Sequence, residues 1–157
     1  MAREARRLGA YAALTREVSL DRWLEKRLHE GARLALPATG GLAPQLRYVG
    51  ALRELVQGPS GAREPHPEAL PATPGDLDLI LLPGLAFGEG GGRLGQGGGF
   101  YDRLLASLDR IRGAARPSPS LVGVCFAVQI VPSVPQESHD VRVDGCVSEL
   151  GLRWFRP

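Results

Sequence analysis

The sequence contains little lysine and few aromatic residues. Lys26 is the single lysine among 19 basic residues, so the phosphate-binding motif G-x-x-x-x-G-K-[ST] is absent from the glycine-rich part of the chain. Aromatic residues make up 6% and do not alternate with Arg, as base-stacking surfaces for RNA would require. No apolar run approaches the roughly 20 residues needed to cross a bilayer, and the first 14 residues lack a signal-peptide pattern. We therefore expect neither a nucleic-acid nor a membrane partner.

Cysteine is also scarce. Cys125 and Cys146 each lie in an apolar, strand-like run, which favours two small buried side chains over a disulfide or a metal pair. This use of cysteine fits a cytoplasmic protein. With 157 residues, 43% of them hydrophobic, and a net charge of +2, residues 1–157 are expected to form one globular domain. The sequence does not determine the oligomeric state, for which we expect a monomer or a weak homodimer.

Glycine, by contrast, is concentrated in one stretch, and nine of the sixteen residues 84–99 are Gly. An apolar run, residues 77–82, precedes the stretch, and an amphipathic run, residues 101–111, follows it. This order predicts a strand, a glycine loop and a helix. Backbone N–H groups of such a loop can converge on an anion, and the helix N-terminus adds partial positive charge. Arg93 adds a guanidinium that suits phosphate oxygens, so the stretch is predicted to bind phosphate.

The remaining elements alternate between strand and helix patterns. Ser19 is a plausible N-cap for a helix that ends at Gly31. The start of the chain is ambiguous, with helical turns over residues 2–8 or a strand over residues 9–14. The other predicted elements are strands at residues 33–37, 47–49, 77–82, 121–127 and 141–147, a short helix at 52–56, a helix at 101–111 and a proline-rich loop at 65–75. This alternation favours a three-layer α/β fold with a mostly parallel central sheet, and ligands then bind beyond the carboxyl ends of its strands.

Other interpretations of these motifs remain open at this point. Gly90, Gly92 and Gly95 match G-x-G-x-x-G, but no helix begins at Gly95, so a dinucleotide site is disfavoured. The glycine run could also be a flexible linker. Asp102 could complement the helix dipole or bind Mg²⁺ beside a triphosphate, and Asp140 could form an Asx turn.

The run PGLAFGEGGGRLGQGGGFYDRLL, residues 83–105, resembles the signature of the 5-formyltetrahydrofolate cyclo-ligase (methenyltetrahydrofolate synthetase) family. Other stretches follow the order of that family, and the likeness covers roughly residues 9–150. They are Tyr11 with Glu17-Val18, residues 31–37, Gly61-Ala62-Arg63-Glu64-Pro65, residues 78–83, and residues 124–135 with His139-Asp140 and Asp144. The resemblance implies a NagB/RpiA/CoA-transferase-like fold.

The resemblance also implies a ligase of folate and one-carbon metabolism that uses ATP as co-substrate and Mg²⁺ as cofactor. Its small-molecule substrate, 5-formyltetrahydrofolate, would be cyclised to 5,10-methenyltetrahydrofolate with release of ADP and phosphate. The formyl oxygen would first attack the γ-phosphate and give a phosphorylated imidate, and the N10 amine would then displace phosphate. Such phosphoryl transfer depends mostly on positioning and charge neutralisation.

The same resemblance implies catalytic and ligand-binding roles for particular residues. Arg93, Tyr101 and Asp102 would be catalytic, and Asp102 and Asp140 would hold Mg²⁺. ATP would contact Arg93, Leu94, Gly95, Gln96, Gly97, Gly98, Gly99, Phe100 and Tyr101. Folate would contact Ala12, Glu17, Gln96, Gly97, Gly98, Gly99 and Phe100.

The chain departs from the family pattern at three places. The basic N-terminal helix of the family is shortened here, with Arg3, Arg6 and Arg7 as candidate replacements. Gly88 stands in place of the usual Asp, and Phe100 in place of the commoner Tyr. The rival hypotheses are therefore an impaired family member that binds nucleotide or folate without turnover, and, more remotely, a small Arg-rich RNA-binding domain.

Overall fold

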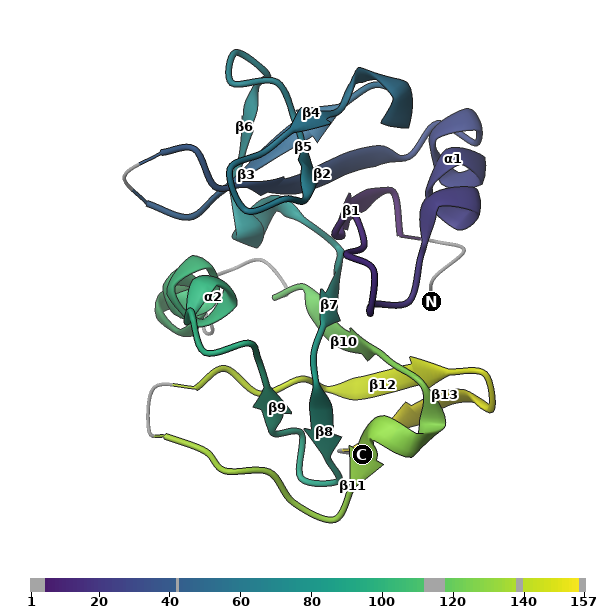
Figure 1. Ribbon diagram of the computed structural model, residues 1–157, viewed down its shortest axis with the longest axis vertical. Helices are drawn as coiled ribbons and strands as arrows, with labels where there is room; N and C mark the ends of the chain where they lie inside the picture. Colours follow the sequence, from purple (N-terminus) through teal and green to yellow (C-terminus); the bar gives the residue numbers. More distant parts are fainter. Residues whose placement is uncertain (1–4, 42, 112–117, 138–139, 156–157) are drawn as a thin grey trace.

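An eight-stranded sheet runs through the molecule, with strand order β13-β12-β10-β7-β1-β2-β3-β6 (Figure 1). This computed structural model describes residues 5–41, 43–111, 118–137 and 140–155. The strands are β1 Arg7–Gly9, β2 Arg33–Ala38, β3 Gln45–Val49, β6 Pro71–Ala72, β7 Leu79–Pro83, β10 Ser120–Val124, β12 Gly145–Ser148 and β13 Gly151–Trp154. The five central strands β12, β10, β7, β1 and β2 are parallel to one another, and β13, β3 and β6 join the sheet through antiparallel pairing. The predicted α/β fold with a mostly parallel central sheet is confirmed.

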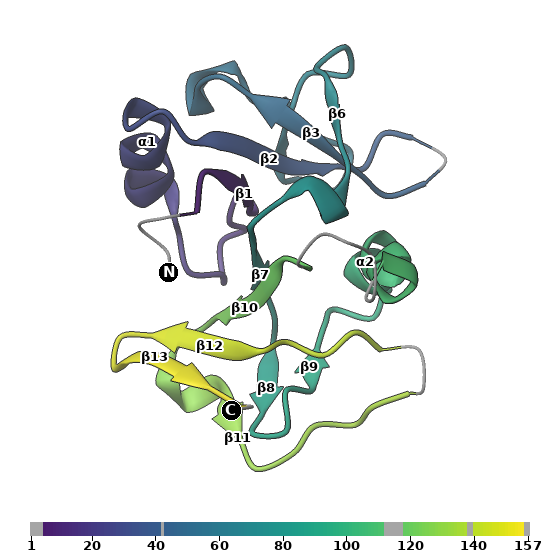
Figure 2. The same ribbon diagram turned by 180° about the vertical axis from the view of Figure 1, so that it is seen from behind.

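The two faces of the sheet pack into two separate cores. In β7, Ile80 and Leu82 point into one core, whereas Leu79 and Leu81 point into the other. This alternation follows from the two-residue period of a strand. Because both faces of β7 are covered, its sequence is a continuous apolar run. Helix α2, Phe100–Ile111, packs on the first core and helix α1, Asp21–His29, on the second. Figure 2 shows the two helices from behind.

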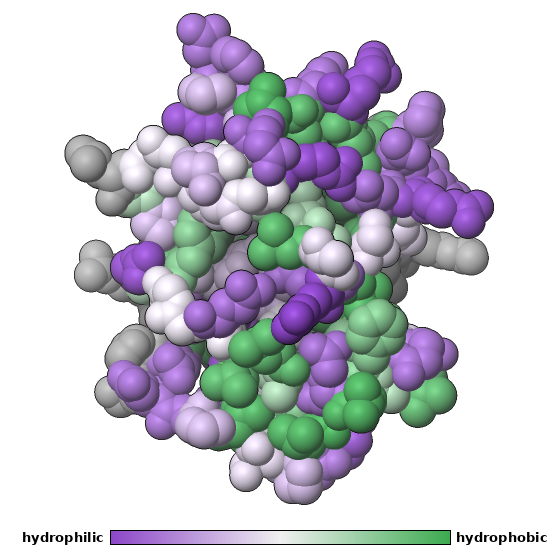
Figure 3. Space-filling view, in the orientation of Figure 1, coloured by the Kyte–Doolittle hydropathy of each residue, from purple (hydrophilic) through white to green (hydrophobic). Residues whose placement is uncertain are grey.

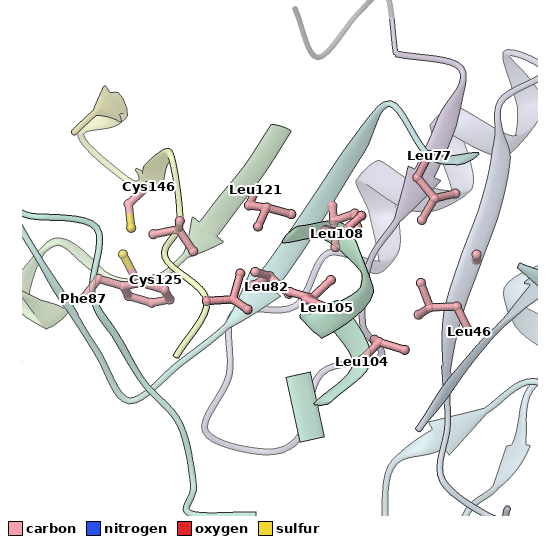
Figure 4. Packing of buried hydrophobic residues seen from close by; sticks show 14 residues of the cluster. Leu46, Leu77, Leu82, Phe87, Leu104, Leu105, Leu108, Leu121, Cys125 and Cys146 are labelled. Carbon is pink, nitrogen blue, oxygen red and sulfur yellow. The ribbon is translucent and has the colours of Figure 1, made fainter. Parts of the chain in front are cut away.

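The core under α2 contains both cysteines (Figure 4). Leu104, Leu105 and Leu108 form the buried face of α2, because positions three and four apart share one side of a helix. The sulfur atoms of Cys125 and Cys146 point toward each other beside Phe87. Both cysteines are free and buried, so the prediction of two small buried side chains is confirmed.

Several boundaries differ from the sequence predictions. The first strand covers residues 7–9 and not 9–14, because Arg7–Gly9 pair with Arg33–Ala35 of β2. That pairing also rules out a helix over residues 7–8, and residues 2–4 lie outside the described chain. The N-cap of α1 is Leu20 and not Ser19, whose hydroxyl oxygen accepts a long hydrogen bond from Asp21 N at 3.4 Å. Gly31 ends α1 with φ of 85°, as predicted.

Short elements complete the fold. They are β4 Val56–Gln57 paired with β5 Arg63–Glu64, and the 3₁₀ helices η1 Leu52–Glu54, η2 Pro74–Asp76 and η3 Ala127–Gln129. The predicted loop at residues 65–75 therefore contains β6 and part of η2. Within the strand region predicted at residues 141–147, only β12 forms, and it begins at Gly145. Strand β13, which follows it, was not predicted.

The glycine-rich stretch is more ordered than a single loop. Strand β8, Ala86–Gly88, pairs with β9, Arg93–Leu94, and with β11, Ile130–Val131, to form a small three-stranded sheet. Only residues 95–99 remain as an open loop before α2. In the part of the chain that the structure describes, no helix is long and apolar enough to cross a membrane.

Candidate functional site

A cavity of about 680 Å³ lies where the parallel strands β1, β2 and β7 end. Its walls include the segment after β1, the end of β2, the end of β7 and the start of α2. This is the carboxyl edge of the sheet, where α/β folds bind their ligands. The cavity is lined by every residue to which the family resemblance assigned a catalytic, binding or metal role: Ala12, Glu17, Arg93 to Asp102, and Asp140.

Arg93 extends from β9 and is nearly buried, with 5% of its side chain exposed. Its Nη2 donates a hydrogen bond to Asp102 Oδ2 at 3.0 Å, and its Nη1 lies 3.5 Å from the carbonyl oxygen of Pro83. The guanidinium also lies over the Tyr101 ring, 5.3 Å from the ring centroid. Its Nε is buried and has no partner among the described residues. A buried donor without an acceptor is costly. Arg93 also lines the cavity, where its positive charge can pair with an anionic oxygen.

Asp102 lies in the first turn of α2 and is held from two sides. Its Oδ2 accepts the hydrogen bond from Arg93, and its Oδ1 accepts one from the backbone N–H of Val141 at 3.3 Å. The ion pair is well shielded, because 17% of the Asp102 side chain is exposed. Asp102 therefore does more than complement the helix dipole, and in this structure its charge is matched by a guanidinium.

The Tyr101 phenol stays neutral at physiological pH. Burial raises the pKa of this phenol, and the nearby carboxylate of Glu17 raises it further, whereas Arg93 acts in the opposite direction. Burial likewise raises the pKa of Tyr11, whose hydroxyl donates to the carbonyl oxygen of Val18 at 2.7 Å. Tyr101 can thus donate a hydrogen bond but cannot serve as a base.

The backbone of the glycine loop is open on the cavity side. A methyl group built on Gly97 or Gly98 would meet no protein atom within 4 Å. Gly97 and Gly99 have φ of 89° and 57°, a conformation that other residues rarely adopt. The loop leads directly into the N-terminus of α2, and oxygen atoms of a phosphate could approach this backbone closely.

Glu17 lines the same cavity as the glycine loop and contacts that loop. Its Oε2 accepts a hydrogen bond from Leu14 N at 2.9 Å, and its Oε1 accepts one from Gln96 Nε2 at 3.4 Å. The second contact joins the segment after β1 to the loop, 79 residues later in the chain. A ligand between these two segments would therefore meet a carboxylate on one side and glycine backbone on the other.

The sequence analysis missed a buried carboxylate in the cavity wall. Glu64, 5% exposed, accepts hydrogen bonds from Thr39 N at 2.8 Å, from the Thr39 hydroxyl, and from the Ser60 hydroxyl at 3.3 Å. All three residues line the cavity. Glu64 was noted only as part of a family-like stretch, and its burial could not be inferred because the surrounding loop has no periodic pattern.

The donor set of the site fits a magnesium ion. Asp102 and Asp140 line the same cavity, and Mg²⁺ in proteins is commonly held by one or two carboxylates together with phosphate oxygens and water. Among the described residues no group of three or more His, Cys, Asp or Glu could hold a metal ion alone. Asp140 Oδ2 accepts a hydrogen bond from Glu137 N, three residues earlier, at 2.7 Å. This is not the Asx turn considered from the sequence, which would join the side chain to the N–H two residues later.

A second, larger cavity of about 830 Å³ lies on the α1 side of the sheet. Its walls are mostly apolar and include Trp23 and Trp154. Arg6 and Arg7 line it and do not line the candidate site, so the prediction that they take the place of the family's basic helix there is wrong. Arg3 lies outside the described residues. Hydrophobic side chains also gather on the surface over the lower half of the view in Figure 3. Apolar exposure alone therefore does not mark a ligand site here.

Comparisons with known proteins show the family to which the chain belongs. A model of the 5-formyltetrahydrofolate cyclo-ligase family matches residues 1–149. A probable 5-formyltetrahydrofolate cyclo-ligase of Caenorhabditis elegans is 31% identical, over 93% of this chain and 74% of the relative. The 5-formyltetrahydrofolate cyclo-ligase of Mycolicibacterium smegmatis is 36% identical, over 84% of this chain and 68% of the relative. The solution structure of Aquifex aeolicus 5,10-methenyltetrahydrofolate synthetase superposes with a TM-score of 0.79 and 32% identity, over 98% of this chain and 74% of that chain.

Proposed function

The chain belongs to the 5-formyltetrahydrofolate cyclo-ligase family, and we propose that the 680 Å³ cavity is its active site. The enzyme converts 5-formyltetrahydrofolate to 5,10-methenyltetrahydrofolate and consumes ATP. One observation carries the assignment of the site: Glu17, the open glycine backbone, Arg93, Asp102 and Asp140 line a single cavity at the carboxyl edge of the sheet.

The reaction needs a better leaving group than a formyl oxygen. In the first step this oxygen attacks the γ-phosphorus of ATP, an O–P bond forms, and the bond to the β-phosphate oxygen breaks to release ADP. In the second step N10 attacks the formyl carbon and loses its proton, the C–O bond breaks, and phosphate leaves with the former formyl oxygen. Both steps build and move negative charge on phosphate oxygens, so fixed donors are the main protein contribution.

The side chains support these steps by position and charge. We assign the triphosphate to residues 93–101, because the open backbone at Gly97 and Gly98 leads into the N-terminus of α2. Arg93 offers a fixed positive charge in a nearly buried position. Tyr101 offers a neutral hydroxyl group, and Phe100 packs against it edge-on with ring centroids 5.2 Å apart.

We assign the folate to the opposite side of the cavity. Ala12 and Glu17 follow β1, and the Glu17 carboxylate can accept hydrogen bonds from N–H groups of a pterin ring. Gln96 contacts Glu17, and the loop from Gln96 to Phe100 lies between the two proposed substrates. This arrangement supports a formyl oxygen placed beside the γ-phosphate, as an in-line attack requires.

We assign Mg²⁺ to Asp102 and Asp140. A bound magnesium ion neutralises charge on the triphosphate. Both carboxylates line the cavity, and both belong to stretches that resemble the family signature. Asp102→Asn is expected to abolish Mg²⁺-dependent turnover and to leave the fold intact, and wild-type activity in this variant would remove Asp102 from the metal site.

A direct assay tests the proposed active site. The protein is mixed with 5-formyltetrahydrofolate, ATP and Mg²⁺, and the near-ultraviolet absorbance of the methenyl product is followed. Arg93→Gln should lose most of the rate, whereas Arg153→Gln, at an exposed Arg–Glu ion pair of 2.9 Å, should retain it. Tight ATP binding with no product in the wild type would favour the alternative of a family member that binds without turnover.

We further propose a cytoplasmic location and a monomer or weak homodimer. Two free, buried thiols support a reducing compartment. Cell fractionation and light scattering of the purified chain test these two points, and a stable dimer at micromolar concentration would contradict the second.

A further inference from the structure

We propose that Arg93 and Asp102 exchange their ion pair for contacts with ligands: Arg93 pairs with a triphosphate, and Asp102 pairs with a divalent cation. The protein then binds the cation and the triphosphate together and binds either one alone only weakly. This inference rests on the proposed function and adds a coupling between the two ligands. It begins from the ion pair between the two residues, 3.0 Å long and with 5% and 17% of the side chains exposed.

The ion pair occupies both groups that the proposed ligands need. A divalent cation that approaches Asp102 meets the guanidinium of Arg93, and a triphosphate that approaches Arg93 meets the carboxylate of Asp102. Water and salt screen such a shielded pair only weakly. A cation that binds alone pairs with Asp102 and leaves Arg93 without a counter-charge, and a triphosphate that binds alone pairs with Arg93 and leaves Asp102 without one. An unmatched charge in such a buried position is strongly unfavourable.

The two ligands together remove this penalty. When a phosphate oxygen pairs with Arg93 while a cation pairs with Asp102, every charge keeps a partner. Arg93 need not leave its place, because the ring of Tyr101 and the carbonyl oxygen of Pro83 also contact its guanidinium.

Asp102 can likewise keep its position when the ion pair breaks. Its Oδ1 accepts the backbone N–H of Val141, so that Arg93 can be replaced at Oδ2 while one contact persists. Coupling between two ligands of this kind is reciprocal, and typical couplings change affinity by about 5- to 150-fold. We expect about tenfold here, because the pair is shielded but not fully buried.

The first test measures Mn²⁺ binding without nucleotide, from the paramagnetic resonance signal of free Mn²⁺. Arg93→Gln should bind Mn²⁺ about tenfold more tightly than the wild type. The double variant Arg93→Gln/Asp102→Asn should lose this gain, and Arg153→Gln, which removes the same charge from an exposed pair, should match the wild type. Unchanged affinity in Arg93→Gln, or a gain that persists in the double variant, would overturn the proposal.

The second test is the reciprocal one and does not depend on Arg93→Gln being folded. Binding of metal-free ATP is measured by calorimetry in the presence of a chelator. Asp102→Asn, which keeps the shape of the side chain, should bind metal-free ATP about tenfold more tightly than the wild type. The same or weaker binding, in a variant that circular dichroism and cooperative unfolding show to be folded, contradicts the exchange.

The two proposals can fail separately. A wild-type protein that forms the methenyl product, together with unchanged Mn²⁺ affinity in Arg93→Gln, would overturn the exchange and leave the proposed function. A wild-type protein that forms no product, together with the expected gains in both binding tests, would overturn the proposed function and leave the exchange.

Discussion

The side-chain amide of Gln129 donates a hydrogen bond to the carbonyl oxygen of Gly84 at 3.0 Å, 45 residues earlier in the chain. The same nitrogen contacts the carbonyl oxygen of Leu85 at 3.0 Å, and Oε1 accepts the backbone N–H of Phe126 at 2.8 Å. Gln129 therefore fixes the start of the glycine-rich stretch to the loop after β10.

Replacement of Gln129 by Ala is expected to lower the free energy of unfolding by about 1–2 kcal/mol, because it removes three hydrogen bonds, only some of them shielded from water. Urea denaturation at pH 7 measures this loss. Gln57→Ala is the matched control, since the amide of Gln57 makes one exposed contact, to the carbonyl oxygen of Gly61. Its loss should stay within about 0.5 kcal/mol. Equal losses in the two variants would show that Gln129 has no special role.

The Arg7–Asp78 ion pair predicts a pH dependence of stability. Burial alone would raise the pKa of the Asp78 carboxyl, but hydrogen bonds from the Arg7 side chain and from the backbone N–H groups of Arg7 and Arg6 outweigh it and lower this pKa. A lowered folded-state pKa adds stability that is fully present above the unfolded pKa, about 4. This stability is lost as the pH falls through the lower folded-state pKa.

Asp78→Asn should therefore be less stable than the wild type at pH 7, by about 1–2 kcal/mol. The difference should shrink as the pH is lowered from about 4 to 2, because both forms of residue 78 are then neutral. Urea denaturation across this range provides the measurement. A difference that stays constant with pH would mean that the charge of Asp78 contributes nothing.

Gly91 and its neighbour Gly90 should respond very differently to replacement by Ala. Gly91 has φ of 85°, and a Cβ atom there would lie 2.5 Å from the carbonyl oxygen of Val143. A Cβ on Gly90 would meet nothing within 4 Å. We expect Gly91→Ala to cost about 3 kcal/mol, from backbone strain and the clash together, and Gly90→Ala to change stability little. Thermal unfolding of both variants decides this, and similar melting temperatures would contradict it.

Elements with a strong periodic pattern could be predicted from the sequence, and those fixed by pairing could not. The α2 helix was found within one residue, since Leu104, Leu105 and Leu108 repeat at helical spacing. The first strand was placed too late, because its apolar run continues past residue 9 and only the register with β2 sets its end. The sheet of β8, β9 and β11 was missed, because glycine carries no side-chain pattern.

The residues of the site were easier to identify than their contacts. The density of glycine and the presence of Arg93 pointed to phosphate without any structure. The pairing of Arg93 with Asp102 could not be foreseen, because these residues are nine positions apart and meet only when β9 folds against the first turn of α2. The buried position of Glu64 likewise depends on the path of a loop.

The two cysteines are expected to be unreactive in the folded protein. Cys125 and Cys146 are 2% and 0% exposed, and the pKa of Cys146 is raised by its hydrogen bond to Cys125 and by burial. Ellman's reagent should label neither thiol in the native state and both after unfolding in guanidinium chloride, because burial denies the reagent access to both sulfur atoms. Rapid labelling of the native chain would indicate that this core opens readily.

In the glycine loop, Gly98 is the position where a substitution by Ala best tests ligand binding without a change in stability. Its backbone φ is not in the left-handed region, and an added Cβ would contact no protein atom within 4 Å. Gly97→Ala, in contrast, would strain the backbone, since φ is 89° there. Gly98→Ala should therefore leave the melting temperature unchanged while its methyl group occupies space that the triphosphate needs.

We expect Gly98→Ala to bind MgATP about tenfold more weakly than the wild type, a change of about 1.4 kcal/mol, as measured by calorimetry. Gly40→Ala is the matched control, because a Cβ there also meets nothing within 4 Å and Gly40 does not line the cavity. It should change neither stability nor affinity. Unchanged affinity in Gly98→Ala would place the triphosphate away from residues 95–99, since a methyl group directly over this backbone could not leave a phosphate bound to it undisturbed.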